Sequence, residues 1–362
     1  MKVIISGGGS GGHVYPAIAI ADGIKAAKPD AEILFVGAKG KIEMEKVPKA
    51  GYSIKALNIR GFDRQRKFRN ITLPFNLLSS LVKASSILKR FKPDVAIGVG
   101  GYASGPLIYT AARKGIPTLL QEQNSYPGIT NKLLSKRANT ICVAYDGMDR
   151  FFKAEKIVLT GNPVRNDIAD LKDQKAKALS YFGLKDKKPI IFAFGGSLGA
   201  RTINESFSQQ VELLKTMDAQ LLWQTGKSYY DQMKETAAAH LPNVKVHQFI
   251  DRMDLAYALA DLIIGRAGAL TISELSMVGK AAILVPSPNV AEDHQTKNAQ
   301  ALSSKAAAVL VKDREAKATL LPTALDLLKD KDRRQQLGTN LKTLAQPDAT
   351  RKIVEEVLKL VE

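Results

Sequence analysis

Short apolar runs alternate with longer amphipathic segments along the whole chain. Buried strands of a parallel sheet are apolar on both faces, whereas the helices between them are apolar on one face only. The pattern therefore predicts an α/β fold with parallel sheets. The predicted strands are Lys2–Ser6, Glu32–Val36, Val95–Val99, Pro117–Gln121, Thr140–Val143, Ile157–Thr160, Pro189–Phe194, Gln220–Gln224, Val244–Gln248, Leu262–Ile264 and Ala282–Val285.

The pattern of the first half recurs in the second half. Residues 2–13 (KVIISGGGSGGH) resemble residues 189–200 (PIIFAFGGSLGA), each with a strand, a glycine-rich turn and a helix start. Residues 95–120 likewise parallel residues 262–285. A chain of 362 residues is long enough for two domains. Glycine and proline at 161–165 (GNPVR) mark the join. We therefore expect two Rossmann-like domains facing each other across a deep cleft at the carboxyl ends of both sheets.

The glycine-rich segment Gly7–His13 follows a predicted strand and begins a predicted helix. Gly7, Gly9 and Gly12 form the GxGxxG pattern of dinucleotide sites. Such a site needs an acidic residue at the end of the second strand. The sequence there reads Ala-Lys-Gly and contains no carboxylate. A P-loop is excluded because His and Val stand where Lys and Ser or Thr are required. The glycines still let backbone amides approach a ligand at a helix N-terminus, although a tight turn is the structural alternative.

His13 lies in the first turn of that predicted helix. The positive end of the helix dipole lowers the pKa of an imidazole and keeps it neutral, as a general base must be. A purely structural histidine is the alternative. In the second half, Ser197 of GGSLGA offers a hydroxyl to a phosphate at a helix N-terminus. Arg165 of GNPVR adds a charge for the same purpose, or is a solvated surface residue.

Two polar segments of the second half suit a nucleotide sugar. Glu274 follows Thr271 by three residues, which is a capping box, and alternatively Glu274 accepts hydrogen bonds from a ribose diol. The segment EDHQTKNAQAL (292–302) crowds carboxylate and amide groups that suit sugar hydroxyls. The four histidines lie at 13, 240, 247 and 294, without the spacing of a metal site. The Asp330–Asp332 pair lies in a charged helical stretch and is expected to be solvated.

Charged residues are distributed unevenly between the two halves of the chain. Residues 1–163 carry 25 Lys and Arg against 11 Asp and Glu, whereas residues 164–362 carry 28 against 24. Between 60 and 92, nine Lys and Arg accompany one Asp, with phenylalanines interleaved. A basic rim around exposed aromatics is the chemistry of docking to an anionic membrane, and nucleic acid would accept the same charges. An apolar helical face at Leu78, Leu81 and Val82 has the protein core as its alternative explanation.

Composition excludes several classes of protein. A hydrophobic fraction of 45% with 24% charged residues is typical of a globular protein and excludes general disorder. The single cysteine, Cys142, forms no internal disulfide and fits a reducing cytoplasm. The N-terminus has too few apolar residues for a signal peptide, and no apolar stretch reaches the length of a membrane span.

The motifs together carry a family resemblance. GGGSGGHVYPA, GGYASGP, QEQN, GNPVR, GGSLGA, FIDRM, RAGALTISE and an Asp-x-Gln-x-x-Asn segment occur in this order over essentially the whole chain. This arrangement resembles the MurG family of N-acetylglucosaminyltransferases. The resemblance implies the GT-B fold and inverting transfer of GlcNAc from UDP-GlcNAc to the C4 hydroxyl of the MurNAc-pentapeptide of undecaprenyl-diphosphate-linked lipid I. The product is lipid II of peptidoglycan synthesis.

The resemblance also implies the place and the division of labour of the domains. Residues 1–163 would form an acceptor-binding, membrane-associated domain, on which a C-terminal helix at about 343–362 packs back. Residues 164–342 would form the UDP-GlcNAc-binding domain. The protein would act as a peripheral protein at the cytoplasmic face of the cell (inner) membrane. UDP-GlcNAc, lipid I and the anionic membrane surface would be its partners, with no cofactor, no metal and no nucleic acid expected.

Individual residues receive roles from the same motifs. His13 would be the general base. Residues implied to bind UDP-GlcNAc are Ser10, Gly11, Gly12, Asn124, Arg165, Ser197, Ile250, Ala269, Leu270, Thr271, Ile272, Ser273, Glu274 and Gln295. The residues expected to face the membrane are Phe62, Arg64, Arg66, Lys67, Phe68, Arg69 and Phe75. Two positions depart from the family pattern, because Ser10 stands where Thr is common and Thr296 where some relatives have Gln.

Three alternatives remain open at this point. One is a glycolipid synthase of the same fold that makes a diacylglycerol glycoside. Another is a UDP-GlcNAc 2-epimerase, which would leave the basic aromatic segment unexplained. The third is of a different class, a nucleic-acid-binding protein that uses the basic half of the chain. No known nucleic-acid-reading motif accompanies that charge.

Overall fold

The computed structural model describes residues 1–61, 72–164, 168, 171, 173–290 and 293–362. They form two compact units. The first consists of Met1–Arg165 together with Asp348–Glu362, and the second of Asn166–Pro347. Arg165 and the basic segment at 62–71, which is predicted to face the membrane, lie outside the described residues.

The first unit is built on a seven-stranded sheet of order β3-β2-β1-β4-β5-β6-β7, in which every pairing is parallel. Its strands are β1 (Lys2–Gly7), β2 (Glu32–Ala38), β3 (Ser53–Leu57), β4 (Val95–Gly100), β5 (Thr118–Glu122), β6 (Thr140–Val143) and β7 (Ile157–Leu159). The central strands are buried along their full length because helices cover both faces of the sheet.

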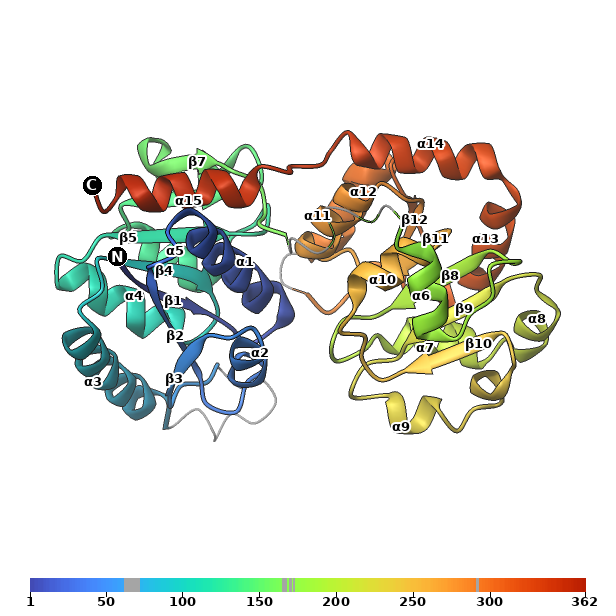
Figure 1. The fold of residues 1–362 in the computed structure, drawn as a ribbon, viewed down its shortest axis with the longest axis horizontal. Coiled ribbons are helices and arrows are strands. Elements are labelled where there is room, and N and C mark those ends of the chain that lie inside the picture. The colour runs from blue at the N-terminus through green and yellow to red at the C-terminus, as the bar shows by residue number, and fades with distance from the viewer. Residues whose placement is uncertain (62–71, 165–167, 169–170, 172, 291–292) are drawn as a thin grey trace. The chain divides into compact units, whose positions relative to one another are not determined.

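Helices cover the two faces of this sheet in distinct groups (Figure 1). The helices are α1 (Gly11–Ala27), α2 (Glu43–Lys49), α3 (Leu73–Phe91), α4 (Ser104–Arg113), α5 (Ile129–Ser135) and α15 (Ala349–Lys359). Apolar side chains of α1, α2 and α15 form one core with the sheet. Those of α3, α4 and α5 form a second core on the other face.

Helix α15 returns to the first unit after the chain has passed through the second. Ile353, Val354 and Val357 of α15 are buried against α1 and the sheet. A Cβ atom at Gly23 of α1 would lie 2.6 Å from Cγ2 of Thr350. The two helices therefore approach as closely as they do because position 23 has no side chain.

The second unit has a six-stranded parallel sheet of order β10-β9-β8-β11-β12-β13. Its strands are β8 (Ile190–Phe194), β9 (Gln220–Gln224), β10 (Val244–His247), β11 (Leu262–Gly265), β12 (Ala282–Leu284) and β13 (Val309–Leu310). Its helices are α6 (Lys175–Phe182), α7 (Arg201–Ser208), α8 (Val211–Thr216), α9 (Tyr230–Met233), α10 (Met253–Leu259), α11 (Ala269–Val278), α12 (His294–Ser303), α13 (Ala316–Lys329) and α14 (Lys331–Lys342).

The predicted parallel α/β architecture is confirmed in both units. Each of the eleven predicted strands is present, with its ends shifted by at most two residues. The sequence missed β3, an edge strand that is only half-buried, and β13, which has two residues. Within the described part of the chain, no helix combines the length and the apolar character needed to cross a bilayer.

Candidate active site

The loops that follow β1 and β4 meet at the carboxyl edge of the first sheet. The amide of Gly8 donates to the carbonyl of Gly100 over 3.3 Å. A Cβ atom at Gly101 would lie 2.3 Å from the carbonyl oxygen of Gly8, and Gly101 has a φ of +90°. Glycine is therefore required at 101 both for its backbone conformation and for this contact.

His13 is held between these two loops, at the start of α1. A Cβ atom at Gly100 would lie 2.8 Å from Nε2 of His13, so the imidazole lies directly against the Gly100 backbone. Nδ1 of His13 lies 3.3 Å from the hydroxyl oxygen of Ser10. Burial lowers the pKa of His13, and this effect exceeds the opposing influence of the Glu122 and Glu43 carboxylates. The pKa is lowered as expected, but the main cause is burial and not the helix dipole.

Glu43 is the residue of this region that the sequence did not single out. It begins α2 and its side chain is buried. One carboxylate oxygen accepts the amide of Gly9 at 2.8 Å, and the other accepts the amide of Ala38 at 2.9 Å. The acidic residue sought at the end of β2 is therefore present, but it comes from the following helix and binds the protein's own backbone.

A second buried carboxylate shapes the loop after β5. Glu122 accepts hydrogen bonds from the backbone amide of Asn124 at 3.0 Å, from the amide of Gly128 at 3.1 Å and from Nδ2 of Asn131 at 2.9 Å. The side chain of Asn124 also donates to Glu122 over 3.3 Å. The loop that carries Asn124, a residue predicted to bind the donor sugar, is thus fixed by an adjacent carboxylate.

The glycine-rich loop of the second unit is fixed by backbone contacts. The amides of Lys227 and Ser228 donate to the carbonyls of Ser197 and Leu198 at 3.0 and 3.2 Å. A Cβ atom at Gly199 would lie 2.1 Å from the carbonyl oxygen of Thr225. Ser197, which is half-buried, therefore stands on a loop that is docked against the segment after β9.

The predicted capping box at Thr271 and Glu274 is wrong. Helix α11 begins at Ala269 with Gly268 as its N-cap, so Thr271 is already inside the first turn. Glu274 lies one turn further on, where it cannot reach the N-cap amide. Its side chain is buried, and it accepts a hydrogen bond from the hydroxyl of Tyr257 on α10 over 2.9 Å. Ala269, Leu270, Thr271, Ile272 and Ser273 form the first turns of α11 directly after the β11 loop.

Two further predicted donor-binding residues are engaged by their own unit. The backbone amide of Ile250 donates to Oε1 of Gln224 over 2.8 Å. The carbonyl oxygen of Ile250 is therefore the backbone group of this residue that is left to bind a nucleobase. Oε1 of Gln295 accepts the amide of Ser287 over 2.8 Å. Asn298, on the same helix α12, is buried and donates to the carbonyl of Ala267 at 3.2 Å. The segments after β11 and β12 are thereby joined at the carboxyl edge of the sheet.

Of the residues predicted to face the membrane, the structure describes only Phe75. Phe75 is described and has 74% of its surface exposed, while Phe62, Arg64, Arg66, Lys67, Phe68 and Arg69 lie outside the described residues. Arg165 lies outside them as well. The core explanation for α3 fails at Leu78 and Val82, whose exposed fractions are 63% and 66%. Across the described ranges, no cluster of three or more His, Cys, Asp or Glu side chains could hold a metal ion.

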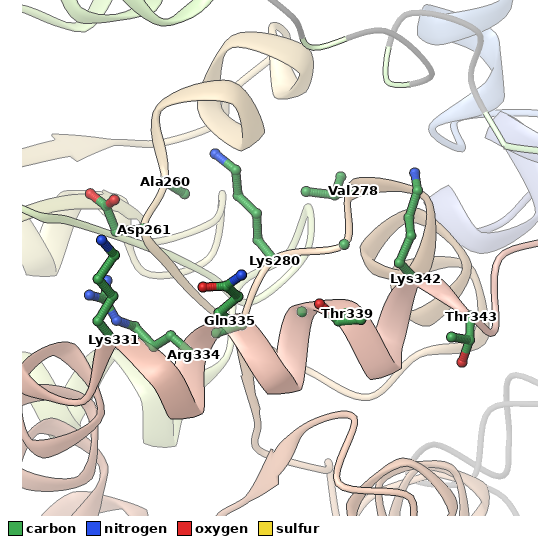
Figure 2. A pocket seen from close by; sticks show the side chains of 13 residues that line it. Ala260, Asp261, Val278, Lys280, Lys331, Arg334, Gln335, Thr339, Lys342 and Thr343 are labelled. Carbon is green, nitrogen blue, oxygen red and sulfur yellow. The ribbon is translucent and has the colours of Figure 1, made fainter.

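A pocket of about 760 Å³ lies at the opposite edge of the second sheet, before the first residues of β11 and β12 (Figure 2). Nζ of Lys280 donates to the carbonyl of Ala258 over 2.7 Å, and Nζ of Lys342 donates to the carbonyl of Met277. These carbonyls lie in the last turns of α10 and α11, so both lysines cap helix C-termini. Burial lowers the pKa of Lys280 to about 8. The pocket is remote from the loops at the carboxyl ends of the strands.

Comparison with known proteins follows this division into two units. Residues 3–143 match the N-terminal domain of glycosyltransferase family 28, and residues 190–353 match its C-terminal domain. The UDP-N-acetylglucosamine--N-acetylmuramyl-(pentapeptide) pyrophosphoryl-undecaprenol N-acetylglucosamine transferase of Cytophaga hutchinsonii is 55% identical over 99% of this chain and 97% of its own. The chain belongs to glycosyltransferase family 28. A family 28 relative of the same name from Flavobacterium psychrophilum is 52% identical over 100% of this chain and 98% of its own.

Solved structures agree with this membership. MurG of Acinetobacter baumannii has a TM-score of 0.72 and 29% identity, and 99% of each chain is covered. UDP-GlcNAc 2-epimerase of Neisseria meningitidis, solved with UDP-GlcNAc bound, has a TM-score of 0.69 over 99% of this chain and 100% of its own. At 14% identity the epimerase shows a shared fold alone. The predicted GT-B class and the predicted glycosyltransferase activity are confirmed for this family 28 member.

Proposed function

We propose that this glycosyltransferase moves GlcNAc from UDP-GlcNAc to the C4 hydroxyl of the N-acetylmuramyl-(pentapeptide) group of pyrophosphoryl-undecaprenol, with inversion at the anomeric carbon. The observation that carries the proposal is the identity of 51–55% with several transferases so named, over at least 99% of this chain. The matched region extends over both units.

We assign the acceptor to the first unit. His13 would take the proton of the acceptor hydroxyl while the oxygen attacks the anomeric carbon and UDP leaves with the electrons of the broken bond. Its lowered pKa supports this role, because the imidazole is then neutral at pH 7. The first turn of α1 has no acidic residue, which suits the negative diphosphate of the acceptor. Ser10, Gly11, Gly12 and Asn124 remain the contacts to UDP-GlcNAc that we propose for residues of this unit.

We assign the donor to the second unit. The carbonyl of Ile250 would accept from the uracil, and Glu274 from the ribose hydroxyls, next to the first turns of α11 at the carboxyl edge of the sheet. Ser197 and Arg165 would contact phosphate oxygens, and Gln295 the sugar. The helix N-termini would then stabilise the charge of the leaving UDP, with no cofactor or metal needed.

We further propose that the protein docks on the anionic cytoplasmic face of the cell membrane through α3. Phe75, Leu78 and Val82 follow each other at helical spacing, and all three are exposed. Lys83, Lys89 and Arg90 are exposed on the same helix, and the basic stretch at 62–71 precedes it. An apolar face with basic neighbours is the composition of a helix that lies in the membrane surface.

Transfer is tested by supplying labelled UDP-GlcNAc with and without a lipid I analogue. We expect label in the lipid product, one UDP released per transfer, and a β linkage in the product. The epimerase alternative predicts conversion of the donor sugar without any acceptor. Epimer formation, or label transferred to diacylglycerol and not to the lipid I analogue, would contradict the proposal.

Docking is tested by sedimentation with vesicles that contain or lack anionic lipid. The triple variant Phe75→Ser, Leu78→Ser, Val82→Ser should lose most of its vesicle binding, since each buried apolar side chain contributes about 1.5–3 kcal/mol. Replacing Arg64, Arg66, Lys67 and Arg69 by Gln should weaken binding by several kcal/mol, at about 1 kcal/mol per cation. Tyr181→Ser removes an exposed aromatic from the second unit and serves as the control. Retention on RNA in place of vesicles would favour the nucleic-acid alternative.

A further inference from the structure

Glu43 joins two loops of the first unit that are far apart in sequence. Its carboxylate accepts the amide of Gly9 at 2.8 Å and the amide of Ala38 at 2.9 Å, with one oxygen for each. The first amide belongs to the glycine-rich loop after β1, and the second follows β2. A single side chain of α2 therefore fixes the loop that leads into α1 and His13.

The surrounding backbone is built to admit this carboxylate. A Cβ atom at Gly8 would lie 2.2 Å from Cδ of Glu43, and a Cβ atom at Gly37 would lie 2.5 Å from its Cγ. Neither glycine has a positive φ, so backbone conformation does not explain them. Both positions lack a side chain because the Glu43 side chain occupies that space.

Fixing a loop with a buried carboxylate is energetically unfavourable compared with apolar packing. Glu43 is 1% exposed, and among the described residues it takes part in no ion pair. Two backbone amides and the N-terminus of its own helix α2 stabilise the charge. Apolar packing holds loops at lower cost, because a buried charge loses its hydration. The free-energy cost of burying the Glu43 charge indicates that this loop geometry serves a purpose other than stability of the fold.

The loop geometry bears directly on the acceptor side of the reaction. With the Gly9 amide bound to Glu43, this part of the loop is closed to a second anion. The amides of Gly11 and Gly12, in the first turn of α1, have no acceptor within the described part of the chain. Ser10, which precedes them, places its hydroxyl 3.3 Å from Nδ1 of His13.

We propose that Glu43 is a positioning residue for transfer: by holding Gly9, it aims the first turn of α1 and the His13 imidazole at the acceptor. The inference rests on the proposed function, in which His13 receives the proton of the acceptor hydroxyl. Glu43 itself touches no substrate and acts through the loop.

The charge of Glu43 also supplies a signal that can be read without substrate. The charged groups that act on His13 are Glu43 from α2 and Glu122 from the end of β5, and both raise its pKa against the larger effect of burial. Removing the charge at 43 therefore lowers the pKa of His13 further. This change reports that the Glu43 charge stands close enough to act on the imidazole, whereas a fall in kcat at unchanged donor KM distinguishes a positioning role from a role limited to stability.

The test compares Glu43→Gln with Glu45→Gln in the full chain. Both lie in the first turn of α2 and lose one charge, but Glu45 is exposed. Gln at 43 presents an NH₂ group to one of the two amides, so one contact is lost. We expect kcat with the lipid I analogue to fall about 10- to 100-fold, because misplaced catalytic groups cost about that much. The KM for UDP-GlcNAc should stay within twofold, and the NMR titration of His13 should shift to lower pH. Glu45→Gln should match the wild type in all three measurements.

Gly37→Ala tests the same geometry without removing the charge. Its Cβ atom would displace the Glu43 side chain, so kcat should fall while donor KM is retained. If Glu43→Gln unfolds below the assay temperature, Gly37→Ala provides the test in its place. An unchanged kcat in either folded variant, or an unchanged His13 titration in Glu43→Gln, overturns the inference. Absence of transferase activity in the wild type would overturn the proposed function, whereas the His13 titration would still decide whether Glu43 acts on this imidazole.

Discussion

The two glycine-rich loops look alike in sequence and are held in different ways. Both follow a central buried strand, β1 or β8, and both lead into a helix. Both make close backbone contacts with a neighbouring loop, but the first is also held by a charged side chain, the Glu43 carboxylate, through the Gly9 amide. The second is held by neutral groups: Nε2 of Gln224 donates to the carbonyl of Gly196 over 3.2 Å. Gly199 and Gly226 also approach so closely that a Cβ atom on either would lie 2.1 Å from backbone of the other segment.

The difference separates a repeated scaffold from its specialised use. Strand, turn and helix recur in both units because parallel α/β units need the same local geometry. A charged support adjusts the electrostatics of the loop as well as its position, and the first loop carries the candidate base. A neutral support only fixes shape, which suffices for a loop expected to hold phosphate through amides and a hydroxyl.

The largest effect should follow removal of the imidazole from the first loop. His13→Ala should lower kcat by about 10²- to 10⁴-fold, the usual range for general-base assistance, with little change in donor binding. Steady-state kinetics with the lipid I analogue checks this, and the acidic limb of the kcat profile should disappear with the side chain. A variant that keeps its kcat and loses only affinity for acceptor or donor would make His13 a binding residue.

Glycine substitutions should separate the two loops by stability. Gly199→Ala places a methyl group on the Thr225 carbonyl at a φ of +91°, so the free energy of unfolding should fall by about 3 kcal/mol or more. Gly9→Ala meets no atom within 4 Å at a φ of +86°, so strain alone should cost about 1–2 kcal/mol. Chemical denaturation measures both, and equal losses would contradict the difference in packing.

Donor binding should depend on the second unit through Glu274. Glu274→Gln keeps an acceptor for the Tyr257 hydroxyl while removing the charge. The KM for UDP-GlcNAc should rise about tenfold or more, since hydrogen bonds to a charged group contribute about 1.5–3 kcal/mol each. Tyr257→Phe removes the bond between α10 and α11 and is the control, with donor KM expected within threefold of the wild type. If KM rises only in the control, Glu274 serves structure and not ribose.

The smallest effect should appear in the dependence of stability on pH. The pKa of His13 in the folded chain lies below its ordinary value of 6.5. The unfolded chain therefore binds the proton more readily, and the folded state loses stability as the pH falls below 6.5. Unfolding of the wild type and of His13→Gln between pH 5 and 8 should show a larger loss in the wild type, because burial also lowers the pKa of His247 and that contribution is common to both proteins. A difference between the two proteins that is the same at every pH would contradict burial of the imidazole.

The sequence predicted the strands well because a buried parallel strand is an uninterrupted apolar run. The sequence did not predict strand β3, because only one face of an edge strand is covered and SIKAL therefore shows no uninterrupted apolar run. The capping box failed because the helix already has its N-cap at Gly268, three positions before Thr271, where the Ser/Thr signal would place it. Glu43 could not be found from spacing, because its role depends on a helix that folds back onto a distant loop.

The return of α15 has a consequence for the biosynthesis of this chain. Ile353, Val354 and Val357 complete a core whose other members come from α1, α2 and the sheet of the first unit. During translation the contiguous second unit, 166–347, is available to fold while the first still lacks its last helix. The apolar side of α1 then stays uncovered until residues 348–362 have left the ribosome. The unit that starts first is therefore finished last, and a nascent chain stalled after Pro347 should bind a chaperone through that uncovered helix.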